Sequence, residues 1–392
     1  MLIVSCKKLL FKNLDYVALM YYYIKNKIAY AFIICAGIMA IFVSCVNKQH
    51  KYYSPNKLLE YVVKNPIDTI SGTCISNYYG LNAMGLDCCD SLLVIMENPS
   101  ASHVFTILNM NNDSIVAQFG NIGHAKNEFI STPNNCYFEK NTSNDICMCF
   151  SDDGIKTKVV NLSKSIIRDN CVLEDILDQK YKSYDFFKIS QDKYFVRQGV
   201  IYEDARDNIF FPPKFVIIEK QKLKEIDLYP MLINSSDYPV LMMTYGSTTK
   251  MAPNKEKVVE ALAYIDIINI IDIKNATVIG LKEKKCYGFS DLDEHKSPKD
   301  FEEFVKICNA GLCLSNKYVF VIRDGRKYKE WHRAETNKNR KLIAFDWQGN
   351  QLFSLCLAER IDFMAYNEKT CQMYGLSYDD GILYKYDLSK YL

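Results

Sequence analysis

The sequence predicts an all-β chain whose antiparallel strand groups repeat around a ring, as in a six-bladed β-propeller. The chain holds 28 Tyr and 21 Phe beside only 2 Trp, and it is also rich in Ile and Val, which are residues that favour strands. Short apolar runs alternate with turn residues, and groups of such runs recur at a period of roughly fifty residues. Four-stranded blades produce this pattern because each blade must stack on its neighbours to bury both faces. A protein of two β-sandwich domains is the alternative.

The predicted strands follow one another from the first third of the chain to its end, and turn residues such as Asn98-Pro99-Ser100 separate them. They are 92–96, 103–108, 114–119, 137–139, 146–150, 156–162, 186–189, 194–202, 215–219, 240–245, 258–264, 267–273, 277–281, 310–313, 318–322, 342–347, 352–357, 362–366, 371–377 and 382–387. A closed ring has no open sheet edge, so we expect the strand at 70–76 to pair with the last blade, which contains 382–387.

Two stretches are predicted to be helical excursions from the blades. The first covers 172–180, and the second covers 298–308, where Phe301, Phe304 and Val305 recur at helical spacing. We expect the second stretch to pack over one rim of the propeller.

The amino-terminal region is typical of an export signal. Residues 28–46 form an uncharged, mostly apolar run that follows Lys25 and Lys27 and contains Phe42-Val43-Ser44-Cys45 near its end. Basic residues, an apolar body and a small residue before Cys45 resemble a bacterial lipoprotein signal, and Met20 is the expected true start. Acyl chains on Cys45 would hold the mature protein on a membrane. An uncleaved signal anchor is the alternative.

These features divide the chain into three parts. We expect a signal segment at 1–44, a lipidated amino terminus and linker at 45–69, and the six-bladed propeller at 70–392. The expected location is the cell envelope, as an outer-membrane lipoprotein that faces the periplasm or the cell surface. We expect a monomer.

Composition argues against several classes of function. The net charge is only +2, so electrostatics give no case for a nucleic acid partner. The five histidines lie in no His-x-His or His-Glu-x-x-His motif, and the sequence has neither a phosphate-binding loop nor a Gly-x-Ser-x-Gly elbow. We therefore predict no catalytic residues, no metal site and no cofactor.

Fifteen cysteines are spread along the chain without a repeating spacing, which does not favour a disulfide framework. Cys147 and Cys149 lie two apart in a predicted strand, and Cys88 and Cys89 are adjacent. No second pair or histidine stands at the spacing of a tetrahedral zinc site, so we interpret these cysteines as small apolar core residues. One or two disulfides remain an alternative.

Three short segments carry a resemblance to a known family. The stretch 115–129 contains Phe119-Gly120 and ends in Glu128-Phe129, although Ala125-Lys126-Asn127 stands where the family has Gly-Pro-Gly. The stretch 250–255 leads into two further predicted strands, and 344–350 reads Ala-Phe-Asp-Trp-Gln-Gly-Asn. Together they resemble the TolB-like six-bladed propeller lipoproteins, for many of which the molecular activity is unassigned.

The resemblance implies a propeller fold and an envelope setting. In the 344–350 turn, Asp346 can accept hydrogen bonds from the turn backbone and Gly349 can take a positive φ, so we expect both to be structural.

One loop mixes basic and aromatic residues and is the candidate binding site. It runs from Arg323 to Arg333, and its candidate binding residues are Arg326, Lys329, Trp331, His332 and Arg333. An indole beside basic groups can stack on a sugar or bind an anion, whereas an exposed charged connection between strands is the structural alternative.

The sequence thus predicts a lipid-anchored, non-enzymatic binding or scaffold module for a protein, peptide or glycan partner. The alternative is a propeller enzyme, a lyase or hydrolase, with its site in the central funnel. The two differ in whether acidic, basic and hydroxyl side chains with perturbed pKa values converge there from several blades.

Overall fold

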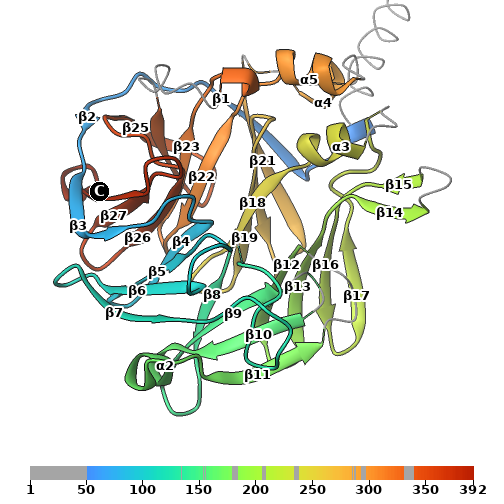
Figure 1. Ribbon diagram of the computed structural model, residues 1–392. Coiled ribbons are helices and arrows are strands. Elements are labelled where there is room, and N and C mark those ends of the chain that lie inside the picture. The colour runs from blue at the N-terminus through green and yellow to red at the C-terminus, as the bar shows by residue number, and fades with distance from the viewer. Residues whose placement is uncertain are drawn as a thin grey trace, which may run out of the picture. The chain divides into compact units, whose positions relative to one another are not determined.

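The computed structural model describes residues 51–392, apart from 134, 153, 155, 179–183, 205–208, 234–237, 285, 287, 293–296 and 331–339. Residues 52–392 form one compact unit, a ring of six antiparallel sheets, which we number as blades 1 to 6 in chain order (Figure 1). The six-bladed propeller that the sequence predicts is therefore confirmed. No helix within the described part of the chain is long and apolar enough to cross a membrane.

The first three blades have four strands each, which run in order from the innermost strand to the outermost. Blade 1 comprises β4 (Gly85–Cys89), β5 (Leu92–Met96), β6 (Phe105–Asn109) and β7 (Ser114–Phe119). Blade 2 comprises β8 (Tyr137–Lys140), β9 (Ile146–Asp152), β10 (Lys156–Asn161) and β11 (Leu173–Asp178). Blade 3 comprises β12 (Asp185–Ser190), β13 (Lys193–Gln198), β16 (Lys214–Glu219) and β17 (Lys222–Ile226), and the hairpin β14 (Ile201–Asp204) and β15 (Ile209–Phe211) extends from it.

The other three blades include strands from the amino-terminal part of the chain. Blade 4 comprises β18 (Ser247–Met251), β19 (Lys257–Leu262), β20 (Ile267–Asp272) and β21 (Thr277–Glu283), with β1 (Lys57–Tyr61) at its outer edge. Blade 5 comprises β22 (Asn309–Leu314), β23 (Tyr318–Arg323), β24 (Lys341–Asp346) and β25 (Gln351–Leu357), with β2 (Thr69–Ile70) outermost. Blade 6 comprises β26 (Phe363–Asn367), β27 (Gln372–Leu376), β28 (Ile382–Asp387) and β3 (Thr73–Tyr79).

The ring closes between the two ends of this unit. β3 pairs antiparallel with β28, with Tyr79 opposite Ile382 and Thr73 opposite Lys385. The expected pairing of the first propeller strand with the last blade is therefore present in the structure. Blade 6 thereby gains β3 as its outer strand, so that both ends of the unit belong to one sheet.

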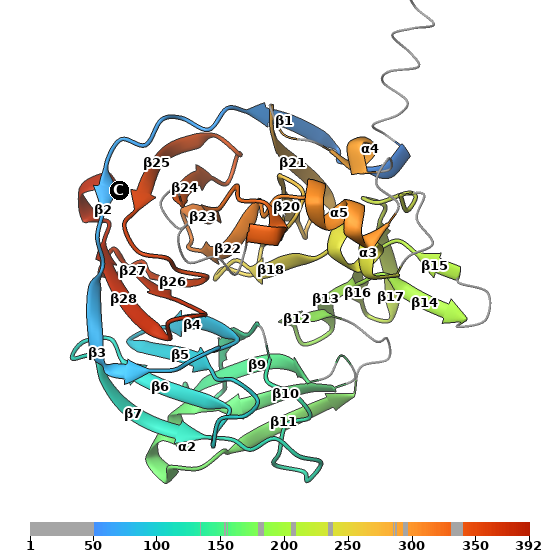
Figure 2. The same ribbon diagram turned by 45° about the horizontal axis from the view of Figure 1, so that its top comes forward.

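The segment before β3 contains two strands that the sequence analysis did not predict. β1 pairs in parallel with β21, and β2 pairs in parallel with β25, within a stretch expected to be a linker. β1, β2 and β3 run along the outer edges of blades 4, 5 and 6 in turn (Figure 2). We call residues 57–79 the strap.

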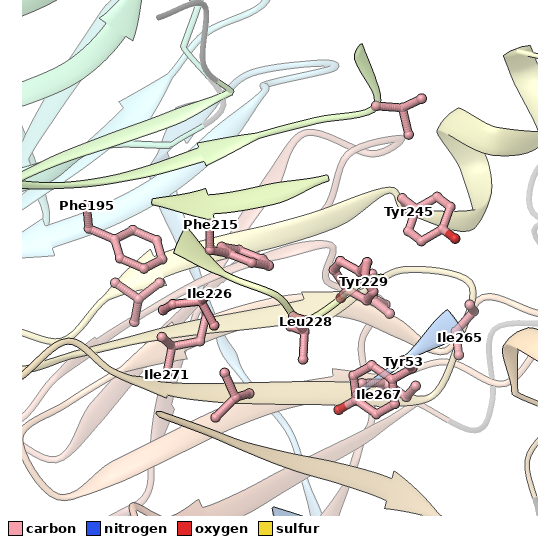
Figure 3. Close-up of a cluster of buried hydrophobic side chains, with 14 of the residues drawn as sticks. Tyr53, Phe195, Phe215, Ile226, Leu228, Tyr229, Tyr245, Ile265, Ile267 and Ile271 are labelled. Carbon is pink, nitrogen blue, oxygen red and sulfur yellow. The ribbon is translucent and has the colours of Figure 1, made fainter. Parts of the chain in front are cut away.

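Aromatic and β-branched side chains fill the space between blades. Phe195 and Phe215 of blade 3 lie close to Ile271 of blade 4 in one buried cluster, and Tyr229 lies beside them (Figure 3). The Tyr229 ring is centred 6.1 Å from Phe215 and 6.0 Å from the Tyr53 ring of the amino-terminal segment. Each such side chain contributes about 1.5–3 kcal/mol when it is fully buried. This apolar packing holds blades 3 and 4 together.

The interpretation of the 344–350 turn is confirmed in detail, and a second glycine turn is found at Gly120. Asp346 Oδ1 accepts hydrogen bonds from the amides of Gln348 and Asn350, at 3.0 and 2.8 Å, and Gly349 takes a φ of +87°. Gly120 takes a φ of +88°, and a Cβ there would lie 2.7 Å from the Phe129 ring. Both positions therefore need glycine.

The helices lie between strands, and one of the two predicted helices is correct. α5 (Pro298–Phe304) begins after Ser297, whose side chain caps its first turn, and it buries Phe301 as expected. The other described helical elements are α2 (Leu162–Arg168), α3 (Tyr238–Thr244), α4 (Phe289–Leu292) and the short 3-10 turns η1 (Tyr328–Glu330) and η3 (Ser389–Tyr391).

The predicted helix at 172–180 is wrong. Residues 173–178 form β11, which pairs with β10, and the helix of this region is α2, one segment earlier. Leu173, Ile176 and Leu177 stand at helical spacing, but pairing with β10 outweighs that local pattern. The side chain of Asn161 fixes the start of α2 by accepting a hydrogen bond from the amide of Lys164.

The predicted strand at 240–245 is also wrong, because these residues belong to α3 and the turn after it. Val240, Leu241 and Thr244 are fully buried, which is the spacing of one helix face. The blade strand begins only at Ser247.

Candidate functional site

A cavity of about 1210 Å³ lies on the propeller axis, at the amino-terminal ends of the innermost strands. All six blades contribute to its wall, through β4, β8, β12, β18, β22, β26 and the residues that precede them. A second cavity of about 530 Å³ lies at the opposite ends of these strands. The two cavities share Cys136, Tyr137 and Lys250 in their linings. We call them the larger and the smaller axial cavity.

A buried ion pair lies across the axis between the two cavities. Lys250 Nζ of β18 is 2.9 Å from Asp87 Oδ2 of β4 and donates a hydrogen bond to the carbonyl of Leu86 at 3.1 Å. These strands belong to blades 4 and 1, which face each other across a ring of six. Burial by itself would lower the pKa of Lys250, but the carboxylate of Asp87 outweighs it and raises that pKa. Lys250 therefore remains charged and joins opposite blades.

A polar network between blades 3 and 4 positions an arginine in the wall of the larger cavity. Arg197 Nε is 2.9 Å from Glu260 Oε1, and its Nη2 donates to the carbonyl of Tyr245 at 2.9 Å. Glu260 Oε2 in turn accepts hydrogen bonds from the Tyr229 hydroxyl and the Asn269 amide, at 2.6 and 2.9 Å. The guanidinium is thus fixed by partners on two blades.

Asp185, at the start of β12, is the cavity carboxyl with a shifted pKa. Burial raises the pKa of Asp185 above the usual range. The positive charge of Arg197, 3.9 Å away, and a hydrogen bond from Asn135 lower this pKa, but they do not cancel the effect of burial. This carboxyl is therefore more easily protonated than a surface aspartate. A neutral carboxyl can donate a hydrogen bond as well as accept one.

Some buried polar atoms in the lining of the larger cavity have no hydrogen-bond partner among the described residues. Among them are the hydroxyl of Thr132 and the amide oxygen of Asn135. Buried polar atoms normally have partners, but each of these exposes less than 1 Å², so water or a ligand reaches it only after the side chain turns toward the cavity.

The far side of the larger cavity carries a second buried charge cluster. Asp362, just before β26, lines the cavity and lies 3.0 Å from Arg340 Nη2. Arg340 is only 2% exposed and also lies 2.8 Å from Asp324. Asp362 is therefore neutralised from within the protein.

A model of the TolB-like 6-blade propeller-like family matches residues 70–369. The chain belongs to this family. Among solved structures, this TolB-like chain is similar to a Bacteroides fragilis NCTC 9343 protein classed as exported, with 9% identity over 84% of this chain and 98% of that one and a TM-score of 0.52. It is also similar to a member of the duf4221 family from Bacteroides vulgatus ATCC 8482, with 12% identity over 86% of this chain and 98% of that one and a TM-score of 0.44. The comparison with curated proteins gives no match.

Of the site residues predicted from sequence, the structure describes two. Arg326 donates two hydrogen bonds of 2.6 Å to the carboxylate of Asp324, so its charge is compensated within the loop. Lys329 is exposed on η1. Trp331, His332 and Arg333 lie outside the described residues, as does the lipidation candidate Cys45.

Sequence reasoning missed the residues that converge on the axis of this TolB-like propeller. Asp185, Arg197 and Lys250 come from two blades, and no short motif links them. The one available signal was polar and small residues in strand-length stretches, such as Ser-Thr-Thr-Lys-Met in β18. Such a stretch fits an innermost strand that borders a cavity.

A cluster with metal-like ligands is better explained as an ion-pair site. Asp266, Glu283 and Cys286 bring potential ligand atoms within 4.8 Å of one another. Arg323 contacts both carboxylates through its two terminal nitrogens and lies 3.0 Å from Cys286 Sγ. The guanidinium already supplies the positive charge that a metal would bring.

The cysteines of the described region behave as core and surface thiols. Every cysteine from Cys74 to Cys371 is free, and Cys147 and Cys149 are buried in the core as predicted. Burial raises the pKa of Cys149 to about 12, which keeps it a neutral thiol.

Proposed function

We propose that this TolB-like chain is a lipid-anchored, non-enzymatic binding module of the cell envelope, with the larger axial cavity and its rim as the binding site for a protein, peptide or glycan. The observation that supports this proposal is the convergence of all six blades on one cavity of about 1210 Å³. Ligand sites in proteins are commonly single concave pockets of about 300–1,000 Å³, with a few polar groups among apolar ones.

The envelope setting is supported by two observations. The amino-terminal run resembles a lipoprotein signal that ends at Cys45, and the Bacteroides fragilis protein of similar fold is classed as exported. A lipid-anchored propeller would face the periplasm or the cell surface. Its membrane partner is then the bilayer that holds the acyl chains.

The test is site-directed photocrosslinking in the native cell. A benzophenone amino acid replaces Thr248, a half-buried residue of the cavity wall, and in a matched variant it replaces Thr277, which is exposed at the start of β21 in the same blade. We expect irradiation to give a discrete adduct at position 248 and none at position 277. Membrane fractions are then analysed for mass and for protein or carbohydrate content.

Equal labelling at both positions, or no adduct at position 248 in protein that folds normally, would contradict a binding role for the cavity. Circular dichroism of each purified variant shows whether it folds.

The raised pKa of Asp185 inside the cavity is the one observation that favours a propeller enzyme as a second candidate. Glycoside hydrolysis, one reaction that carboxyls catalyse, usually needs two of them. The other aspartate that lines this cavity, Asp362, is bound to Arg340, and no described residue of the lining is a histidine. The enzyme alternative predicts that the captured ligand is converted by the wild type and remains unchanged with Asp185→Asn.

A further inference from the structure

We propose that the larger axial cavity binds an uncharged pyranose chain, which enters from the mouth and lies against the wall formed by Thr132, Asn135 and Phe186. This inference rests on the proposed function, because it names the ligand of the same cavity. It follows from the charge balance of the wall, its unpartnered polar atoms, its aromatic rings and the ion pair beneath it.

The charge balance of the wall favours an uncharged ligand. The charged residues in the described lining are Asp185, Arg197, Lys250 and Asp362. Each already faces an opposite charge. Arg197 pairs with Asp185 and Glu260, Lys250 pairs with Asp87, and Asp362 pairs with Arg340. An ionic ligand would lose its hydration without gaining an unpaired counter-charge.

The unpartnered atoms favour a ligand rich in hydroxyl groups. The Thr132 hydroxyl can donate and accept, whereas the Asn135 amide oxygen can only accept. Thr132 is 6% exposed, and a ligand reaches its hydroxyl and the Asn135 oxygen when these side chains turn toward the cavity. Sugar hydroxyls both donate and accept, so they can satisfy both kinds of atom.

Aromatic rings border the cavity from opposite sides. Phe186 lies on β12 of blade 3, and Phe363 lies on β26 of blade 6, and both side chains are only partly buried. A pyranose ring presents apolar C–H faces beside its hydroxyl edges. Those faces can cover the phenyl rings and remove their apolar surface from water.

The ion pair beneath the cavity distinguishes a sugar chain from a peptide. Lys250 and Asp87 lie across the axis between the two cavities, so a chain that enters the larger cavity meets them with its end. A peptide end carries a charged amino or carboxylate group. That group would find no unpaired opposite charge there, because Lys250 and Asp87 already neutralise each other. A sugar chain ends in hydroxyl groups, so it enters without bringing a charge into the cavity.

The test measures binding of defined hexamers to the detergent-solubilised full chain by calorimetry. The neutral probes are maltohexaose, cellohexaose, mannohexaose and chitohexaose, and the charged probe is hexagalacturonic acid. A hexapeptide of alternating Ala and Ser with free ends represents the peptide alternative. We expect at least one neutral hexasaccharide to bind, and the charged sugar and the peptide to bind at least tenfold more weakly.

Two variants connect binding to the cavity wall. Thr132→Val keeps the shape but removes the hydroxyl, and we expect it to weaken binding about tenfold, as the loss of one buried hydrogen bond does. Thr277→Val, which changes an exposed residue at the start of β21, is the matched control and should bind as the wild type does. Phe186→Leu gives an independent test if Thr132→Val fails to fold.

The outcomes separate this inference from the proposed function. Failure of all four neutral hexasaccharides to bind, or equal binding of the charged sugar or the peptide, overturns the ligand class. Crosslinking at position 248 would in that case still support a binding module. Loss of both signals overturns the two proposals together.

Discussion

At the scale of single residues, the chemistry of this protein is concentrated in charged side chains that meet between blades. Arg197 and Glu260 are 63 residues apart in sequence, yet their side chains lie 2.9 Å apart. Lys250 and Asp87 are separated by 163 residues. Asp185 differs from them because burial outweighs its partners and leaves its carboxyl more easily protonated.

The raised pKa of Asp185 predicts how stability depends on pH. Its carboxyl stabilises the fold fully below the unfolded pKa of about 3.9, and that contribution is lost as the pH rises through the higher folded pKa. Asp185→Asn removes this dependence. We therefore expect the melting temperature of the wild type minus that of Asp185→Asn to decrease as the pH is raised from 4 to 8 in calorimetric scans.

Asp192→Asn is the matched control, because it changes an exposed aspartate in the turn after β12. A wild-type melting temperature that rises relative to Asp185→Asn over this pH range would show that the folded pKa is lowered instead.

None of these residues could be recognised as a set from the sequence. Asp185 and Arg197 stand opposite each other on β12 and β13, and Lys250 lines the same cavity from the next blade, yet each looks like an ordinary surface residue locally. By contrast, Asp346 and Gly349 were predicted correctly, because their turn depends on contacts within five residues.

At the scale of elements, the sequence predicts strands with long apolar runs well but misses two of the six innermost strands. β20 (Ile267–Asp272) has five consecutive buried residues, and its apolar run marks it clearly. β4 (Gly85–Cys89) and β18 (Ser247–Met251) were not predicted, because they contain small and polar residues that border the axial cavities. The other four strands that border the larger cavity, β8, β12, β22 and β26, carry enough apolar residues to be predicted.

The closing strand gives a prediction at this scale. Ile75 of β3 is 4% exposed and packs in one buried cluster with Leu376 and Leu383 of blade 6. We expect Ile75→Ala to lower the free energy of unfolding by about 2–5 kcal/mol, measured by urea denaturation, because it leaves a cavity where the ring closes.

Ile67→Ala is the matched control in the strap, since Ile67 is 63% exposed and its truncation should change stability by less than about 0.5 kcal/mol. Equal effects of the two substitutions would show that β3 contributes no more than a surface segment.

At the scale of the whole molecule, the strap connects the proposed anchor to the ring. β1, β2 and β3 add strands to blades 4, 5 and 6, so the first described segment of the chain contacts half of the propeller. A protein held on a membrane through Cys45 would thus be tethered through the chain that leads into β1, the first strand of the strap.

The anchor itself gives the last prediction. Cys45→Ala should abolish acylation, so the protein should lose its membrane retention or remain unprocessed, as seen by fractionation and by mass spectrometry of the mature amino terminus. Cys74→Ala, which changes an exposed cysteine of β3, should leave both unchanged. Full membrane retention of processed Cys45→Ala protein would exclude the lipid anchor.

The pairing of β3 with β28 has a consequence for the order of folding. Thr73 and Lys385 are neighbours in the ring but lie near opposite ends of the chain, whereas most other strand pairs join consecutive strands. Synthesis produces β3 early and β28 last, so the hairpins of blades 1 to 5 can form while β3 has no partner. Closing so long a loop is slow, because its entropy is lost before its contacts form. The nascent chain must therefore keep the edge of β3 from pairing with other strands until its last residues have been made.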